Sequence, residues 1–233
     1  MMENVLVLKN VTKKYGKKVA LNNLNINIST GKIIGLLGPN GSGKTTFIKT
    51  IMRIIRHQSG EIFVCGQPVS FTTRSYVSFM PDREFLYDSM TIQDSINYYK
   101  DMFSDFDSEK AMYLCSKLGL NVNDSVNSLS KGNKEKVVLM LTLARNVPIY
   151  LLDEPLGSLD PVIKHEMLSV IKEISNANNV IIISTHLIKD VCPILDSAIF
   201  LNQGNICDFF DVKNIDKSLE QHYLEVFTNG QLY

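Results

Sequence analysis

The feature that most constrains the fold is a glycine-rich segment directly after an apolar run. The run covers residues 33–37, and the segment that follows reads Gly38, Pro39, Asn40, Gly41, Ser42, Gly43, Lys44, Thr45 and Thr46. A buried strand, a glycine turn and a helix in this order aim backbone N–H groups and the positive helix end at one point, where an anion binds. Because strand and helix flank the segment, a chance glycine turn is disfavoured, and a phosphate-binding loop is predicted.

The residue types inside the loop suggest how a polyphosphate is held. Glycines at 38, 41 and 43 let the main chain approach where a β-carbon would clash. Lys44 is expected to reach the β- and γ-phosphate oxygens, and Thr45 to ligate magnesium. The loop therefore predicts a nucleoside triphosphate and Mg²⁺ as ligands.

Hydrophobic periodicity predicts strands and helices along the rest of the chain. Residues 5–11 and 19–28 alternate apolar and polar side chains, which indicates antiparallel strands. Later apolar runs separated by helical patterns indicate a parallel sheet covered on both faces. The predicted helices cover 45–55, 92–103, 107–118, 133–145, 161–175 and 187–195, and the predicted strands cover 61–64, 76–79, 149–152, 180–184 and 198–201. The tail after about residue 211 has no assignment.

A pair of acids completes the candidate catalytic chemistry. The apolar strand at 149–152 ends in Asp153 and Glu154. Ligands of parallel sheets bind at this carboxyl end. Asp153 is expected to hold the magnesium, and Glu154 to polarise an attacking water.

The amino-acid composition disfavours several classes of binding partner. The 24 basic and 24 acidic residues cancel and no basic block is present, which disfavours direct binding to nucleic acid or to a membrane surface. Four widely spaced cysteines argue against zinc or a disulfide framework. The sequence opens with no signal peptide, and every apolar run is shorter than the roughly 20 residues that span a bilayer. Any membrane crossing is therefore expected to come from another subunit.

One further segment carries a family resemblance. Leu129, Ser130, Lys131, Gly132 and Asn133 open a predicted helix about twenty residues before the acid pair. They resemble the Leu-Ser-Gly-Gly-Gln signature of ABC ATPases, with departures at 131 and 133. The Ser-Lys-Gly form is similar to that of the bacterial exporter branch for drugs, peptides and polysaccharides.

The resemblance implies roles for four more residues. Tyr15 resembles the aromatic residue that stacks on adenine, and Asp160, within residues 157–160, resembles the loop that organises the dimer interface. His186, after the strand at 180–184, is similar to the switch histidine that contacts the γ-phosphate and Glu154. Asp82 stands where most members have a glutamine, and an acid there can serve as a magnesium ligand.

The resemblance also implies an architecture and a mode of action. It implies a single α/β P-loop domain over 1–233. Residues 1–83 and 131–210 would form a RecA-like, mostly parallel core with an N-terminal antiparallel subdomain, 84–130 an inserted helical subdomain, and 211–233 a tail. Two copies, identical or related, would sandwich ATP between Lys44 of one and Ser130 and Gly132 of the other. The chain would lie in the cytoplasm on the inner face of the membrane, held by an integral membrane subunit, without inserting itself, and would energise export.

Other readings stay open at this stage. A P-loop GTPase or small-molecule kinase shares the phosphate loop, although the sequence has no Asn-Lys-x-Asp guanine motif. A non-transport ABC ATPase of the iron-sulfur assembly type shares every motif except the signature variant. The cargo is not visible in this sequence.

Overall fold

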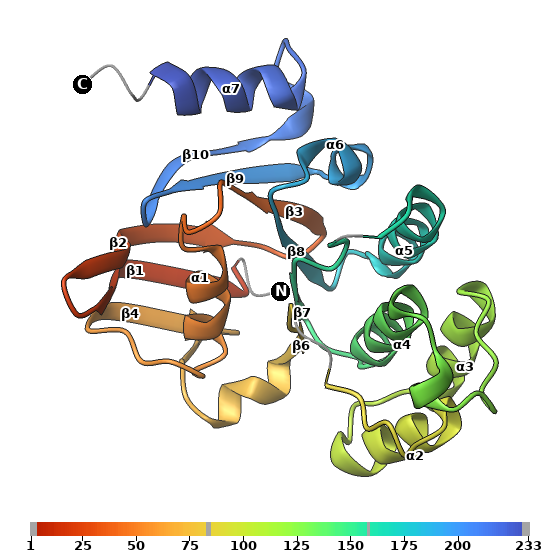
Figure 1. Ribbon diagram of the computed structural model, residues 1–233. Coiled ribbons are helices and arrows are strands. Elements are labelled where there is room, and N and C mark those ends of the chain that lie inside the picture. Colours follow the sequence, from red (N-terminus) through yellow and green to blue (C-terminus); the bar gives the residue numbers. More distant parts are fainter. Residues whose placement is uncertain (1–3, 83–84, 158, 230–233) are drawn as a thin grey trace.

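The computed structural model describes residues 4–82, 85–157 and 159–229, arranged around two β-sheets (Figure 1). In chain order the elements are β1 (Leu6–Tyr15), β2 (Lys18–Ile28), β3 (Lys32–Leu37), α1 (Lys44–Ile51), β4 (Ser59–Val64), β5 (Gln67–Pro68), a 3-10 helix (Thr72–Tyr76), β6 (Val77–Met80), α2 (Ile92–Met102), α3 (Ser108–Lys117), a 3-10 helix (Val126–Ser128), α4 (Lys131–Leu143), β7 (Ile149–Asp153), α5 (Pro161–Ile174), β8 (Val180–Thr185), α6 (Ile188–Val191), a 3-10 helix (Cys192–Ile194), β9 (Ser197–Asn202), β10 (Asn205–Asp211), a 3-10 helix (Val212–Asn214) and α7 (Leu219–Asn229).

The smaller sheet is antiparallel and has the order β2-β1-β4-β5. Leu6 pairs with Ile28, and Leu8 pairs with Ile26, so the buried side chains of both strands share one face. This register follows from the alternation of apolar and polar residues, because successive side chains in a strand point to opposite faces. The predicted antiparallel strands at 5–11 and 19–28 are confirmed.

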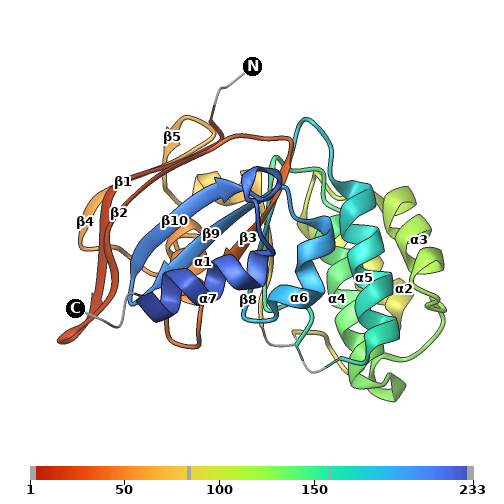
Figure 2. The same ribbon diagram turned by 90° about the horizontal axis from the view of Figure 1, so that it is seen from above.

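The larger sheet has the order β10-β9-β3-β8-β7-β6, with every neighbouring pair parallel except β10 and β9. Its central strand β8 is buried on both faces. Ile181 and Ile183 pack in a core with α3, α4 and α5, whereas Ile182 packs in a second core with α1 and the antiparallel sheet. Figure 2 shows these layers on opposite sides of the sheet. The expected mostly parallel α/β core is confirmed.

Two predicted helices are shorter in the structure. Helix α1 ends at Ile51 instead of residue 55, because Arg53 adopts a left-handed φ of 53° and Arg74 donates hydrogen bonds to the carbonyl oxygens of Met52 and Arg53. The helix predicted over 187–195 is α6 followed by a 3-10 turn. That turn contains Pro193, which has no N–H for a longer α-helix.

Helices α2 and α3 form a lobe that stands beside the sheet and contacts α4 (Figure 1). Arg145, just after α4, ties this lobe to the core. Its guanidinium forms a two-point ion pair with Asp105 at 2.8 and 2.7 Å and donates to the Val77 carbonyl oxygen at 2.9 Å. The lobe packs on α4, which the sequence division at residue 130 assigns to the core, and that division stays a prediction.

The tail without a sequence assignment folds onto the far edge of the larger sheet. Strand β10 pairs with β9, and α7 lies beyond it (Figure 1). Aromatic rings join α7 to the sheet: Phe200 of β9 meets the Tyr223 ring edge-on at 5.4 Å, and Tyr223 stacks on Phe227 within α7. No helix in the described part of the chain combines the length and apolarity that crossing a bilayer requires.

Candidate active site

The glycine-rich segment forms a tight loop between β3 and α1. Gly43 has a φ of 115° and stands at the N-terminus of α1, where a β-carbon would lie 2.5 Å from the Ala20 carbonyl oxygen. A β-carbon on Gly38 would lie 2.1 Å from the Leu201 carbonyl oxygen. Both positions therefore need glycine for the close approach of neighbouring backbone. The loop leaves the first N–H groups of α1 directed at one hollow, as an anion site requires.

Lys44 lies in this hollow with only 6% of its surface exposed. Its ammonium donates to the carbonyl oxygens of Gly38 at 2.8 Å and Pro39 at 3.2 Å, and it lies 3.6 Å from the Glu154 carboxylate. Burial lowers the pKa of Lys44, and the Glu154 charge opposes that change. The side chain thus folds back on its own loop, within reach of any phosphate that the loop binds.

Asp153 has the features of a cation ligand. Its Oδ1 accepts hydrogen bonds from Ser184 at 2.5 Å and Thr45 at 3.2 Å, whereas its buried Oδ2 has no partner among the described residues. Burial raises the pKa of Asp153, and the charges of Asp82 and Glu154 add to the effect. An unpaired buried carboxylate oxygen beside a threonine hydroxyl fits a hard divalent cation such as Mg²⁺.

Glu154 is held by the ends of two strands. Its φ of 50° is left-handed, and its backbone N–H donates to the Ser184 carbonyl oxygen at 2.9 Å. The carboxylate accepts a hydrogen bond from Thr185 at 3.1 Å, and Nδ1 of His186 lies 3.2 Å from both carboxylate oxygens. Such strain at a non-glycine residue marks functional sites. The structure therefore brings Lys44, Glu154 and His186 together, as the sequence predicts.

The hollow around these residues has a volume of about 320 Å³. The lining includes the predicted residues Tyr15, Asn40, Gly41, Gly43, Lys44, Thr45, Thr46, Asp82 and Glu154. Lys18 and Ala20 also line it, and sequence reasoning missed them. Both residues lie at the start of β2, and they come close to the phosphate loop only because β2 pairs with β1. Ser42, within the loop itself, is buried, and its hydroxyl has no hydrogen-bond partner among the described residues.

The signature residues lie elsewhere. Neither Ser130 nor Gly132 belongs to the lining of the hollow. Ser130 caps α4 by accepting a hydrogen bond from the Asn133 N–H at 3.3 Å, and a β-carbon on Gly132 would meet Ile163 of α5 at 2.4 Å. Asp160 likewise caps α5, accepting from two N–H groups at 3.0 Å. Ser158, two residues before Asp160, lies outside the described residues.

The fold and the site define an α/β P-loop nucleotide hydrolase. Within that class, residues 21–157 match the family described as ABC transporter. The chain therefore belongs to the ABC transporter family, as one of its ATP-binding and ATP-hydrolysing subunits.

A curated relative agrees with this assignment, and two solved structures share the fold. The lantibiotic transport ATP-binding protein SrtF of Streptococcus pyogenes is 30% identical over 204 residues, covering 87% of this chain and 89% of the relative. A solved ATP-binding subunit of an ABC transporter superposes with a TM-score of 0.87 at 24% identity, covering 96% of this chain and 99% of that one. The dimeric ATP-binding cassette MJ0796 bound to ADP and phosphate gives a TM-score of 0.78 at 23% identity, covering 90% and 100%.

Proposed function

We propose that this chain energises export of a substrate, a peptide or a drug, through a separate membrane subunit, and that it does so by ATP-driven pairing with a second ATPase subunit. The observation that carries the ATPase part is the meeting of three elements at one hollow. Lys44 of the phosphate loop and Glu154 after β7 line the hollow. Asp153 at the end of β7 contacts Thr45 of this lining, and His186 after β8 contacts Glu154. Loop, acid and base thus surround the place where a γ-phosphate would lie.

Each residue at the hollow has a separate role in phosphoryl transfer. The Lys44 ammonium exchanges its contacts with the Gly38 and Pro39 carbonyl oxygens for phosphate oxygens. Thr45, Asp153 and Asp82 would hold Mg²⁺, which when bound neutralises phosphate charge. Tyr15, 48% exposed at the end of β1, offers its ring to adenine. Catalysis of this kind consists mainly of positioning and charge stabilisation.

Glu154 is proposed to orient the attacking water and accept its proton. His186 and Thr185 fix the direction of the carboxylate through their contacts with its oxygens. His186 is 46% exposed on its side chain, so its other ring nitrogen is free to turn toward a γ-phosphate. Loss of that phosphate would release the histidine, which links hydrolysis to movement at the surface of the site.

The separation of Ser130 and Gly132 from the hollow supports a paired arrangement. The hollow is open on one side, and its own signature residues do not reach it. A second copy, or a related chain, would present its Ser130, Gly132 and α4 N-terminus to the phosphates, with Asp160 at the contact between copies. The dimeric cassette with similar fold supports the same pairing.

Coupling to a membrane subunit follows from family membership, and the direction rests on the Ser130-Lys131-Gly132 form of the signature. The chain would then lie on the inner face of the membrane, held there by its membrane subunit. The name of the similar protein SrtF, a lantibiotic transport ATP-binding protein, supports a peptide as cargo. Vesicles that contain this chain with its membrane subunit should move the cargo away from the ATP side. Movement toward the ATP side would replace export with uptake.

The Glu154→Gln variant tests the site. We expect it to bind ATP, to hydrolyse it about 1,000-fold more slowly and to accumulate as a dimer, because removal of a general base costs about 100- to 10,000-fold. Turnover assays and size-exclusion chromatography with ATP measure both effects. Glu109→Gln, an exposed site on α3, is the matched control. Wild-type turnover by Glu154→Gln would remove Glu154 as the activating carboxylate.

A further inference from the structure

Helices α5 and α6 begin directly after two loops that have different roles in the proposed mechanism. Asp160, expected at the contact between two copies, is the N-cap of α5. His186, which contacts the Glu154 carboxylate, lies two residues before the first residue of α6. A link between these two helices would therefore connect the proposed place of the γ-phosphate with the contact between subunits.

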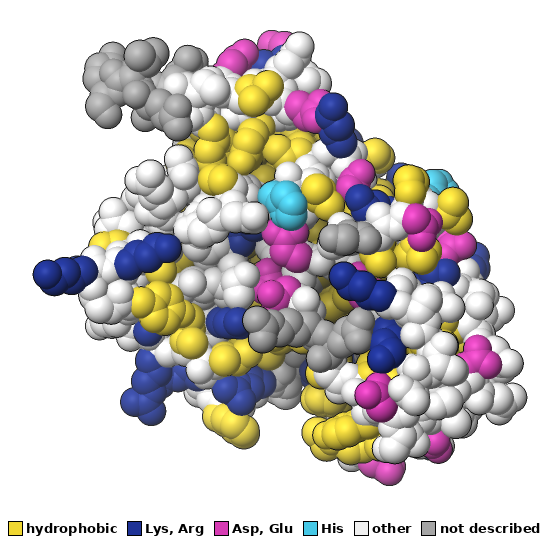
Figure 3. Space-filling model, viewed as in Figure 1, with side chains coloured by type: hydrophobic (Ala, Val, Ile, Leu, Met, Phe, Trp, Pro, Cys, Tyr) yellow, Lys and Arg dark blue, Asp and Glu magenta, His cyan; other side chains and the backbone are white. Residues whose placement is uncertain are grey.

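A single ion pair forms this link. The Lys164 ammonium of α5 lies 2.7 Å from the Asp190 carboxylate of α6, and 19% and 31% of the two side chains are exposed. Both residues line a groove of about 460 Å³ between the helices. Across the described ranges, no other hydrogen bond or ion pair joins α5 to α6. Figure 3 shows acidic and basic side chains next to each other where these helices meet.

Lys164 is fixed to the loop that contains Asp160. The Asp160 carboxylate accepts hydrogen bonds from the N–H groups of Val162 and Ile163 at 3.0 Å, and the Lys164 N–H donates to the Asp160 carbonyl oxygen at 3.1 Å. Lys164 thus stands in the first turn of α5, where the positive end of the helix disfavours a cation. The Asp190 carboxylate offsets this cost, so the placement of the ammonium depends on α6.

Asp190 is connected to the catalytic carboxylate through one hydroxyl group. Thr185 donates a hydrogen bond to Glu154 at 3.1 Å, and the same hydroxyl oxygen accepts one at 3.0 Å from the N–H of Leu187, the N-cap of α6. A movement of the loop at His186 would therefore change the start of α6 and the position of Asp190. Both helices also pack on one apolar core, so the fold itself does not depend on the ion pair.

We propose that Lys164 and Asp190 are positioning residues, which convey the state of His186 to Asp160 at the contact with the second subunit. Neither of them lines the hollow of the phosphate loop, so they act through other residues and not on the nucleotide. This inference rests on the proposed function, because it requires a second subunit at Asp160. A pair that only stabilises the fold would alter unfolding and leave the pairing of subunits unchanged.

The test compares Lys164→Gln, Asp190→Asn and the double variant of the full chain. Each single variant should bind ATP as the wild type does and lose about tenfold in kcat, because residues between coupled sites change the coupling about 2- to 30-fold. The double variant should also lose only about tenfold, since both substitutions break the same link. Lys164→Arg keeps the ion pair and should keep most of the wild-type kcat.

Two measurements separate positioning from stability. In the Glu154→Gln background, which should form dimers with ATP, loss of the ion pair should raise the ATP concentration for half-maximal pairing about tenfold in analytical ultracentrifugation. The ATP affinity of the single chain, measured at protein concentrations too low for pairing, should stay unchanged. The Tm of each variant should stay within about 4 °C of the wild type, because a partly exposed ion pair contributes little to stability.

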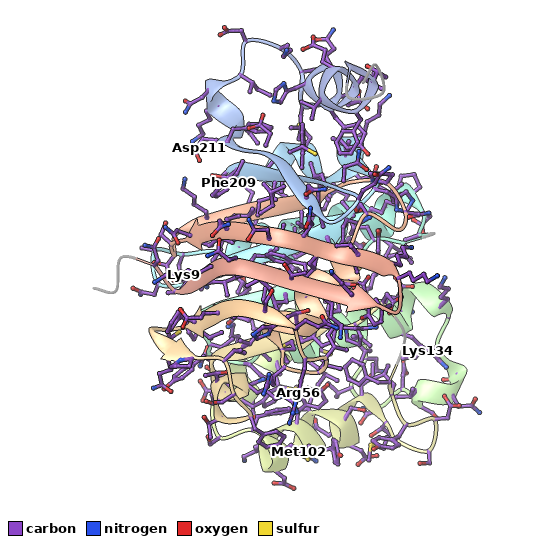
Figure 4. All side chains as sticks on the ribbon, turned by 90° about the vertical axis from the view of Figure 1, so that its left-hand side faces the viewer. Lys9, Arg56, Met102, Lys134, Phe209 and Asp211 are labelled. Carbon is purple, nitrogen blue, oxygen red and sulfur yellow. The ribbon has the colours of Figure 1, made fainter. Side chains whose placement is uncertain are left out.

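The matched control is the ion pair on the other side of α6. Lys189 lies 3.4 Å from Glu220 and joins α6 to α7. Figure 4 shows α7 and β10, with Phe209 and Asp211, in the upper part of the molecule, whereas Lys134 of the signature helix α4 lies lower. Lys189→Gln with Glu220→Gln removes the same charges from the α6 side and should leave kcat and pairing unchanged.

Three results would overturn the positioning role: wild-type kcat and pairing in both single variants, an equal loss in the control, or a loss of about 100-fold in the double variant, which would mean that the two residues act separately. Reduced kcat with unchanged pairing and a much lower Tm would also overturn it, because the pair would then be a structural contact. Unaffected variants beside an active, pairing wild type refute the positioning role alone. A wild type that neither hydrolyses ATP nor pairs with it refutes the proposed function.

Discussion

The Asp153→Asn substitution should make the ligand-free protein more stable and at the same time weaken its response to Mg²⁺ and ATP. In the wild type, the carboxylate is fully buried, and its Oδ2 has no partner among the described residues. A buried polar group without a partner costs about 1–3 kcal/mol, and a charged one costs more. Because asparagine leaves a neutral amide in the same place, we expect the gain from removing the charge to be about 1–3 kcal/mol. Asparagine keeps the shape, removes the charge and relieves the repulsion from Asp82 and Glu154. We therefore expect the variant to be more stable than the wild type when no divalent cation is present.

The expected gain in the free energy of unfolding corresponds to a measurable rise in the melting temperature, Tm. A domain of this size changes its Tm by about 2–4 °C per kcal/mol, so a rise of about 2–12 °C is expected for Asp153→Asn in EDTA. Mg²⁺ with ATP should raise the Tm of the wild type and leave the variant almost unchanged, because ligands stabilise only the state that binds them. Differential scanning fluorimetry of both proteins, with and without Mg²⁺ and ATP, measures both shifts.

The pH dependence has a defined sign. Burial raises the pKa of Asp153 in the folded state above the usual 3.8. The folded protein therefore takes up this proton before the unfolded chain does, and the penalty of the buried charge disappears as the pH falls through the raised pKa. The stability difference between variant and wild type should narrow on acidification toward 3.8. A variant that is less stable in EDTA, or that keeps the full Mg²⁺-ATP shift, would refute this reasoning.

Two further predictions concern the switch histidine and the lobe contact. His186→Ala should bind ATP normally and lose about 100-fold in kcat, because a misplaced carboxylate costs about that much. Stopped-flow binding and turnover assays measure both effects, with the exposed His165→Ala variant as the control. A normal kcat would show that His186 has no part in catalysis. Arg145→Met should lower the Tm by about 6–12 °C, because breaking a buried ion pair costs about 3 kcal/mol. Thermal unfolding measures this Tm change, and the control is Lys117→Met, which removes an exposed ion pair with Glu173. Equal Tm shifts for the two variants would contradict the prediction.

Local patterns account for what the sequence could predict. The apolar runs of β7 and β8 are buried on both faces, so their hydrophobicity alone identifies them. Their carboxyl ends then place Asp153, Glu154 and His186 together. The phosphate loop is equally local, since nine consecutive residues supply it.

The features that the sequence did not reveal depend on partners distant along the chain. Helix α1 ends early because Arg74, more than twenty residues later, binds the carbonyl oxygens of Met52 and Arg53 just past its end. Lys18 lines the site only through strand pairing. Helix α7 is fixed by packing against β9, where Tyr223 and Phe227 contact the Phe200 ring. The roles of Ser130, Gly132 and Asp160 stay predictions, because a second chain would be needed to complete their contacts.

The most direct test of the paired site mixes two inactive variants. Lys44→Ala removes the phosphate loop contact, and Ser130→Arg blocks the signature surface. Each alone should be inactive, but in a mixed dimer one of the two sites keeps an intact Lys44 and an intact Ser130. Random pairing of equal amounts should restore about one quarter of wild-type ATP turnover. A mixture as inactive as its components, or full activity of Ser130→Arg by itself, would contradict a site shared between two chains.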